Sequence, residues 1–116
     1  MLARTNSLKT NADFTRVKTQ GKKVPSDSFT LVFIKSEKEG PSRFGFVIST
    51  KISKHASLRN RAKRAMSEGV RRSTYFVKEG YDCVFLAKPI IVKKYTNDLM
   101  KEVEETLIKA GLVKQS

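Results

Sequence analysis

The sequence is poor in the residues that carry most catalytic and redox chemistry. It contains one cysteine, Cys83, and one histidine, His55, among 116 residues. A single cysteine leaves neither an internal disulfide nor a thiolate metal cluster, and its apolar setting predicts a reduced, buried thiol. No second histidine or carboxylate lies near His55 in the sequence to complete an acid–base pair. We therefore expect no catalytic residue, and a capping or phosphate-contact role for His55.

Long hydrophobic runs are also missing. The longest apolar stretch, Cys83 to Val92, is interrupted by Lys88 and Pro89, and a membrane span needs roughly 18 residues. The first ten residues lack the apolar stretch of a secretory signal. Metal-ligand spacings of His, Cys, Asp or Glu and phosphate-cradling glycine loops are absent from the sequence. These absences predict a cytoplasmic protein.

Negative charge is scarce. Eleven Asp and Glu residues stand against 24 Lys and Arg residues, which gives a net charge of +13. Such an excess in a folded domain indicates nucleic acid as the partner, with a membrane surface as the second possibility. The length favours one domain that buries about two-thirds of its unfolded surface. We expect residues 1–116 to form a single RNA-binding domain, with residues 1–10 as an irregular, partly mobile basic arm.

Periodicity and end signals predict the order of elements. The predicted elements are a helix over 11–20, a brief edge strand after Gly21, strands over 28–35 and 43–50, a helix within 53–72, a strand over 81–88 and a helix from Thr96 or Asn97 to about 110. The strands over 28–35 and 43–50 should form an antiparallel hairpin across Gly40 and Pro41. On the last helix, Glu102, Glu104 and Glu105 should face solvent. The expected architecture is one sheet packed against helices.

The helix within 53–72 carries the strongest functional signal. One arc of about 100° should be buried, and it holds Leu58, Ala62, Ala65, Met66 and Gly69. The other faces carry six cations and, within 59–72, a single carboxylate, Glu68. Guanidinium and ammonium groups pair with phosphates and release counterions. The alternative is a solvated face that keeps the protein soluble, but such faces usually mix charge signs.

The run RNRAKR, residues 59–64, follows a KISK connector at 51–54, and together they resemble the protein subunit of bacterial ribonuclease P. Two further motifs agree in order and spacing, namely Phe14, Val17 and Gly21, and the strand opening Arg43-Phe44-Gly45. The resemblance covers about residues 7–110. It implies an α+β, single-domain α/β sandwich of the ribosomal-protein type, of order α-β-β-β-α-β-α. Its four-stranded sheet would contain a left-handed β-α-β crossover, although the residues alone favour a right-handed one.

The same resemblance implies a function and a set of site residues. The protein would join ribonuclease P RNA and help it remove the 5′ leader of precursor tRNA, with the RNA as catalyst. The residues against that RNA would be Lys51, Lys54, Arg59, Asn60, Arg61, Lys63 and Arg64. A cleft between the first helix and the sheet would bind the leader through Phe14, Val17, Lys18 and Phe33. Mg²⁺ would be held mainly by the RNA, with no organic cofactor, no membrane partner and no protein oligomer implied.

This chain departs from the family pattern at three positions. Lys18 stands where the family usually has a second aromatic residue, so charge would replace stacking in part of the cleft. Ser53 replaces a usual glycine in the connector, and Ser67 replaces an arginine expected after Lys63 and Arg64. The central run at 59–64 is unaffected.

Other interpretations remain open from the sequence. Phe14, Val17 and Phe33 are equally readable as core residues. A ribosomal or other structural RNA-binding protein would share the charge, the size and the element order, and a response to a tRNA leader distinguishes the two. A nucleoid-type DNA binder would need an element that enters a DNA groove. A stand-alone ribonuclease would need an acid–base constellation of its own.

Overall fold

The computed structural model describes residues 6–73 and 76–114. In chain order the elements are α1 (Asn11–Gln20), β1 (Lys22–Pro25), β2 (Phe29–Lys35), β3 (Arg43–Val47), α2 (Ala56–Ser73), β4 (Tyr81–Ala87), the 3₁₀ helix η2 (Pro89–Lys93) and α3 (Thr96–Lys109). This confirms the predicted order α-β-β-β-α-β-α. The structure adds one element that was not predicted, the 3₁₀ helix η2. It begins at Pro89, and proline is well suited to the first position of a helix as well as to the end of a strand.

The four strands form one sheet in the order β1-β2-β4-β3. Strand β2 pairs antiparallel with β1 and β4, whereas β3 pairs parallel with β4. The predicted hairpin between residues 28–35 and 43–50 is therefore wrong, because β4 lies between the two strands. Residues 82–85 of β4 are fully buried, and a central position gives their backbone groups partners on both sides. The left hand of the β3-α2-β4 crossover stays a prediction.

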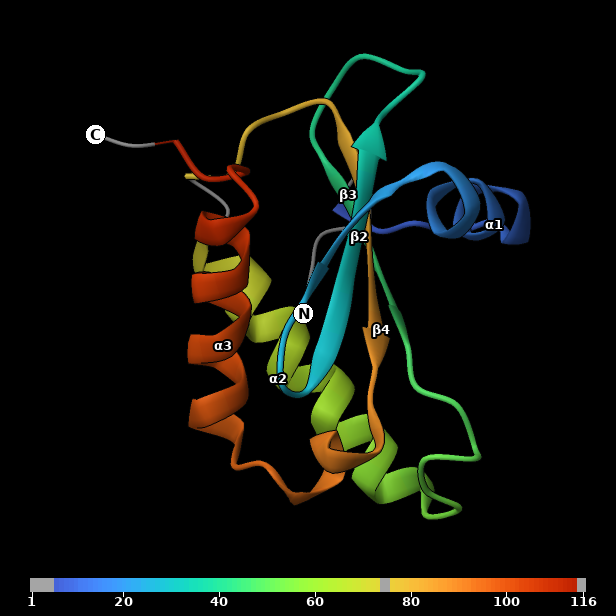
Figure 1. The fold of residues 1–116 in the computed structure, drawn as a ribbon, viewed down its shortest axis with the longest axis vertical. Coiled ribbons are helices and arrows are strands. Elements are labelled where there is room, and N and C mark those ends of the chain that lie inside the picture. The colour runs from blue at the N-terminus through green and yellow to red at the C-terminus, as the bar shows by residue number, and fades with distance from the viewer. Residues whose placement is uncertain (1–5, 74–75, 115–116) are drawn as a thin grey trace.

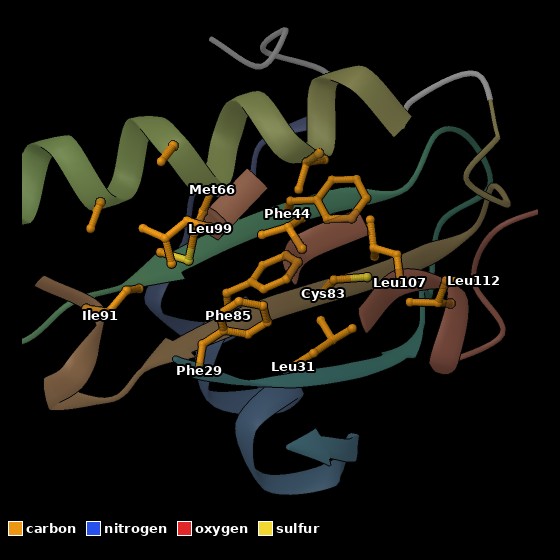
Figure 2. Packing of buried hydrophobic residues seen from close by; sticks show 14 of the residues in the cluster. Phe29, Leu31, Phe44, Met66, Cys83, Phe85, Ile91, Leu99, Leu107 and Leu112 are labelled. Atoms are coloured by element: carbon orange, nitrogen blue, oxygen red, sulfur yellow. The ribbon is translucent and has the colours of Figure 1, made fainter. Parts of the chain in front are cut away.

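The two faces of the sheet are covered unequally (Figure 1). Helices α2 and α3 cover one face, and α1 covers the other. Under α2 and α3 lies the larger apolar cluster, which includes Phe29, Phe85, Met66 and Leu99 (Figure 2). Cys83 belongs to this cluster as a buried free thiol, and burial raises its pKa. Under α1 lies a smaller cluster of Leu8, Val17, Val32 and Val84.

Most of the face of α2 that was predicted to be buried packs against the rest of the protein. Ala62, Ala65, Met66 and Gly69 are buried, and Leu58 is half-buried. A Cβ at Gly69 would lie 3.0 Å from the Met100 carbonyl oxygen and from Val103 Cβ of α3. The glycine therefore lets the two helices approach closely. No helix among the described residues is long and apolar enough to cross a membrane.

The start of the described chain is attached to the sheet. The Leu8 amide donates to the Phe44 carbonyl at 3.0 Å, and Asn6 Nδ2 donates to the Ser42 carbonyl at 2.9 Å. Residues 6–8 thus lie along the open edge of β3 instead of forming a free arm, and residues 1–5 of the expected arm lie outside the described residues. Helix α1 then begins as predicted, with the Thr10 hydroxyl accepting from the Asp13 amide at 3.1 Å.

Glu102 departs from its predicted place on the solvent side of α3. Its carboxylate accepts from the Ser28 amide at 2.8 Å, from Ser28 Oγ at 2.7 Å and from Ser26 Oγ at 2.5 Å. These bonds attach α3 to the turn between β1 and β2. The helix itself begins at Thr96 as predicted, but Tyr95 occupies the N-cap position and its side chain makes no capping bond.

Candidate nucleic-acid interface

The run at residues 59–64 divides into side chains that project and side chains that brace the fold. Asn60, Lys63 and Arg64 are exposed on α2. Arg59 and Arg61 are half-buried, because Arg59 Nη1 donates to the Ser53 carbonyl at 2.6 Å and Arg61 Nη2 donates to the Val92 carbonyl at 2.7 Å. A guanidinium carries five N–H donors. Both arginines therefore hold local structure and still have donors available for phosphate oxygens.

The connector before α2 adds further positive charge at the same end of the helix. Lys51 and Lys54 are exposed, and short serine-mediated turns shape the backbone around them. The His55 carbonyl accepts from the Leu58 and Arg59 amides, so His55 begins the helix through its backbone. The first turn of α2 contains no acidic residue, and the amide groups at a helix N-terminus favour anions. We define the RNA ridge as the exposed cations Lys51, Lys54, Lys63 and Arg64.

Phe14 of α1 lies directly on the backbone of β3. A Cβ at Gly45 would overlap the end of the Phe14 ring, so the ring occupies the space that any other residue's side chain would fill. The ring is half-buried there. The glycine of the strand opening Arg43-Phe44-Gly45 is thus explained by the approach of one aromatic side chain.

The arginine of the same strand opening belongs to a buried ion-pair network. Asp82 of β4 is fully buried and accepts from Arg43 Nε at 2.9 Å, from Arg43 Nη2 at 2.8 Å and from Arg16 of α1. The bond to Asp82 raises the pKa of the Arg43 guanidinium. Arg43 Nη1 also lies 3.5 Å from a carboxylate oxygen of Asp13. This network attaches α1 to the sheet beside Phe14.

Sequence reasoning missed this network. A signal was present, because an aspartate inside the apolar strand YDCVFLA needs a buried partner. Which arginines supply it depends on the pairing of β3 with β4 and on the position of α1, and periodicity gives neither.

One cavity of about 770 Å³ joins α1 to the basic helix. Phe14 and Leu8 line one side of it, and Asn60, Lys63 and Arg64 line the other. Its further lining comes from Ser7, Phe44, Gly45, Phe46, Arg61, Ala65, Ser67, Glu68, Thr96 and Met100. Phe14 of one predicted surface and part of the basic run of the other therefore line one cavity. Leu8, Ser67 and Thr96 were not among the predicted site residues.

Three predicted cleft residues do not line this cavity. Val17 is fully buried beneath α1, and Lys18 is exposed elsewhere on that helix. Phe33 packs against the cluster of the α2–α3 face, with its ring centroid 6.1 Å from that of Tyr81 in edge-to-face contact. Successive side chains of a strand face opposite sides of a sheet, and Val32 and Ile34 are the β2 residues that pack on the α1 side. The expectation that Phe33 faces the cleft is therefore wrong, because its neighbours in the strand, and not Phe33 itself, point toward α1.

The described part of the chain holds no group of three or more His, Cys, Asp or Glu side chains that could bind a metal ion. The cavity and the RNA ridge offer a ligand cations, an aromatic ring and backbone groups. Groups of these kinds pair with phosphates and stack on bases. This is the chemistry of nucleic-acid binding.

Known proteins share both the sequence and the fold. A family model described as Ribonuclease P matches residues 2–111. The ribonuclease P protein component of Microcystis aeruginosa is 30% identical over 115 residues, covering 97% of this chain and 96% of that protein. The component of Pelotomaculum thermopropionicum is 36% identical over 102 residues, covering 88% and 86%.

Solved structures agree. The Staphylococcus aureus RNase P protein superposes with a TM-score of 0.86 at 25% identity, covering 94% of this chain and 98% of that one. The Thermotoga maritima RNase P protein shares the fold, with a TM-score of 0.78 at 23% identity, and the match covers 89% and 96% of the two chains. The chain therefore belongs to the ribonuclease P protein family, as the RNA-binding, non-catalytic protein subunit of the tRNA-processing endonuclease that it forms with ribonuclease P RNA.

Proposed function

We propose that the cavity binds the single-stranded 5′ leader of precursor tRNA while the RNA ridge binds ribonuclease P RNA. The observation that carries the proposal is that one cavity brings the Phe14 ring together with Lys63 and Arg64. Single-stranded nucleic acids bind where a positive groove follows the backbone and aromatic rings stack with bases. Stacking tolerates every base, which suits leaders of differing sequence.

The basic residues divide into two roles in this proposal. Lys51, Lys54, Lys63 and Arg64 are exposed, so they pair with phosphates and reduce the repulsion between two polyanions. Arg59 and Arg61 hold the connector and η2 against α2 through the Ser53 and Val92 carbonyls, and offer their remaining donors to RNA, as exposed Asn60 does. On α1, Lys18 would contact leader phosphates where the leader leaves the cavity.

We place the catalytic Mg²⁺ on the RNA. Hydrated Mg²⁺ binds phosphates and keeps most of its waters, and no acidic cluster suited to it occurs in the described residues. The protein's cations then act on Mg²⁺ only indirectly, by changing the electrostatic potential around the RNA. We further propose that the protein acts in the bacterial cytoplasm, where leaders are removed from new tRNA transcripts.

The test has two readouts. Cleavage of a precursor tRNA by a bacterial ribonuclease P RNA is measured at low Mg²⁺ with and without the protein, and binding of leader-bearing and leaderless tRNA to the assembled complex is compared. We expect the protein to restore cleavage and to create a preference for the leader. Tight, salt-sensitive binding to structured RNA in general, with no rescue of cleavage, would instead support a structural RNA-binding role.

Two variants separate the two surfaces. Phe14→Ala should remove the leader preference and spare binding of mature tRNA, whereas equal loss for both would make Phe14 a core residue. Lys51→Ala combined with Lys54→Ala, on the part of the RNA ridge that does not line the cavity, should make the salt dependence of binding to ribonuclease P RNA shallower by up to about two units of slope. The matched control is Lys38→Ala with Lys109→Ala, which removes two exposed cations outside the RNA ridge. An equal change in the control would refute the clamp role.

A further inference from the structure

The junction between η2 and α3 presents an aromatic side chain to solvent beside two cations. Tyr95 is 78% exposed, and among the described residues it is the most exposed large hydrophobic side chain. Lys93 and Lys94 directly precede it, and Ile90 of the same junction is 47% exposed. Single exposed aromatic residues are common on proteins. The case for a site therefore rests on how this ring is held and on what lies next to it.

The backbone that carries Tyr95 is fixed on both sides. The Lys94 amide donates to the Ile91 carbonyl at 3.2 Å, and the Leu99 amide donates to the Tyr95 carbonyl at 3.0 Å. Tyr95 is the N-cap residue of α3 in an extended conformation, and its side chain makes no capping bond. The ring thus projects into solvent from a hydrogen-bonded backbone, and it contributes little to the packing of the fold. Such a ring can bind a partner with little loss of conformational entropy.

The junction is continuous with the proposed RNA surface. Arg61 of α2 donates to the Val92 carbonyl at 2.7 Å and so holds the junction against the basic helix. Thr96, next to Tyr95, lines the same cavity as Asn60 and Lys63. Figure 1 shows η2 and the start of α3 at the lower end of the molecule, the end at which the connector enters α2. An RNA that covers the start of α2 would therefore lie within reach of the junction.

We propose that Tyr95 is a stacking site for an unpaired nucleotide of ribonuclease P RNA, with Lys93 and Lys94 contacting the flanking phosphates. The ring face suits a nucleobase, and the adjacent ammonium groups suit its backbone. The RNA subunit is favoured over the leader because Arg61, which is expected to contact that RNA, is bonded to the junction through the Val92 carbonyl. The junction also lies at the end of the molecule where the basic connector enters α2, whereas α1, which carries Phe14, covers the other face of the sheet (Figure 1). The inference rests on the proposed binding of that RNA by the neighbouring RNA ridge and adds a contact outside it.

A fluorescence measurement tests the stacking directly. The sequence contains no tryptophan, so Tyr95→Trp introduces a single indole whose emission reports on this position alone. We expect a bacterial ribonuclease P RNA to quench that emission before any tRNA is added. Phe76→Trp is the matched control, because Phe76 is 53% exposed and follows the opposite end of α2. Its emission should not change.

Affinity gives the second readout. Tyr95→Ala should weaken binding to the RNA about tenfold, in line with the loss of one stacked base, and leave the salt dependence unchanged because no charge is removed. Tyr95→Phe should bind like the parent protein. Lys93→Ala with Lys94→Ala should make the salt dependence shallower, which separates the phosphate contacts from the stacking.

The outcomes also separate this inference from the proposed function. Unchanged indole emission in a complex that forms normally, or parent-like affinity of Tyr95→Ala, would overturn the stacking site alone, provided that the parent protein still prefers leader-bearing tRNA. Quenching that appears only when leader-bearing tRNA is added would assign Tyr95 to the leader and likewise overturn the inference. If the parent protein does not bind the RNA at all, the proposed function fails first and the inference fails with it.

Discussion

The two faces of the sheet differ in what holds their helices in place. On the α2–α3 face, Phe85 lies at the centre of a continuous apolar cluster, with its ring centroid 5.2 Å from that of Phe29 and 5.4 Å from that of Phe46. On the α1 face, four buried apolar residues are supplemented by the ion pairs of Asp82. Strand β4 serves both faces through alternate residues. Most of the hydrophobic stabilisation therefore lies on one face, and the other combines a thin core with the wall of the cavity.

Phe85→Ala should produce the largest loss of stability. Truncation of a fully buried phenylalanine leaves a cavity and costs about 4 kcal/mol, and Phe85 also loses both aromatic contacts. The measurement is the free energy of unfolding in denaturant. Val84→Ala, the neighbouring change on the α1 face, should cost only about 2 kcal/mol, since it removes two methyl groups. Equal losses would contradict the idea that the α2–α3 face dominates stability.

Asp82→Asn should come next and should affect function as well as stability. It removes the shared buried anion of Arg16 and Arg43, whose side chains are 15% and 24% exposed, and leaves them only the more exposed carboxylates of Glu37 at 3.9 Å and Asp13 at 3.5 Å. Breaking a buried ion pair of this kind costs about 3 kcal/mol. Because Arg16 then no longer holds α1 to the sheet, we expect the preference for leader-bearing tRNA to fall. The readouts are denaturant unfolding and the ratio of the two tRNA affinities.

Glu102→Gln is the control for that variant. It removes the charge of a half-buried carboxylate that accepts hydrogen bonds from Ser26 and Ser28 and attaches α3 to the turn between β1 and β2. The variant should lose stability and keep its leader preference. If Asp82→Asn also keeps the preference of the parent protein, the ion pairs do not position α1 for leader binding.

The sequence predicts what depends on neighbours along the chain. Helix α1 has its predicted bounds because Thr10 caps it and Gly21 ends it, and the buried face of α2 follows from a period of 3.6 residues. The hairpin prediction failed because periodicity does not say which strands become neighbours. Phe33 was assigned to the wrong face because β2 is apolar on both sides, so alternation gives no direction.

The candidate site was predicted in its residue types but not in its geometry. The run at 59–64 identified the basic helix, yet only the structure shows that Arg61 is bonded to the Val92 carbonyl and that Phe14 shares a cavity with Arg64. The role of Asp82 needed the register that places Arg43 opposite it. Such contacts join residues far apart in the chain, and local pattern carries no information on them.

Gly45→Ala should have a smaller effect on stability and a specific effect on the cavity. The new methyl group would overlap the Phe14 ring, so the ring must move away from β3, at a cost of about 1 kcal/mol for a small overpacking change. Leader affinity should fall several-fold while affinity for ribonuclease P RNA stays the same. A double-mutant cycle checks the cause, because Gly45→Ala should cost almost nothing in a Phe14→Ala background. Additive losses would show that the strain lies elsewhere.

Glu68→Gln should have the smallest effect, and in the opposite direction. Glu68 lines the cavity and accepts a hydrogen bond from Arg71. It therefore adds a negative charge to the basic helix and pairs with an arginine that could otherwise bind phosphate. Its replacement should tighten RNA binding a few-fold at low salt, and the gain should vanish at high salt because Glu68 and Arg71 lie at the surface, where salt screens their charges. The measurement is a salt titration of RNA affinity. The control is Glu105→Gln, which removes the charge of an exposed carboxylate on α3.

The pH dependence gives the same pair a second test. The hydrogen bond from Arg71 lowers the pKa of Glu68, so the carboxylate stays charged throughout the neutral range. The pair's contribution to folding is present above the ordinary carboxyl pKa and is lost as pH falls through the lowered value in the folded protein. Mild acidification should therefore not reproduce the tighter binding of Glu68→Gln. If Glu105→Gln tightens binding equally, the gain comes from net charge alone, and the position of Glu68 beside the cavity has no special influence on RNA.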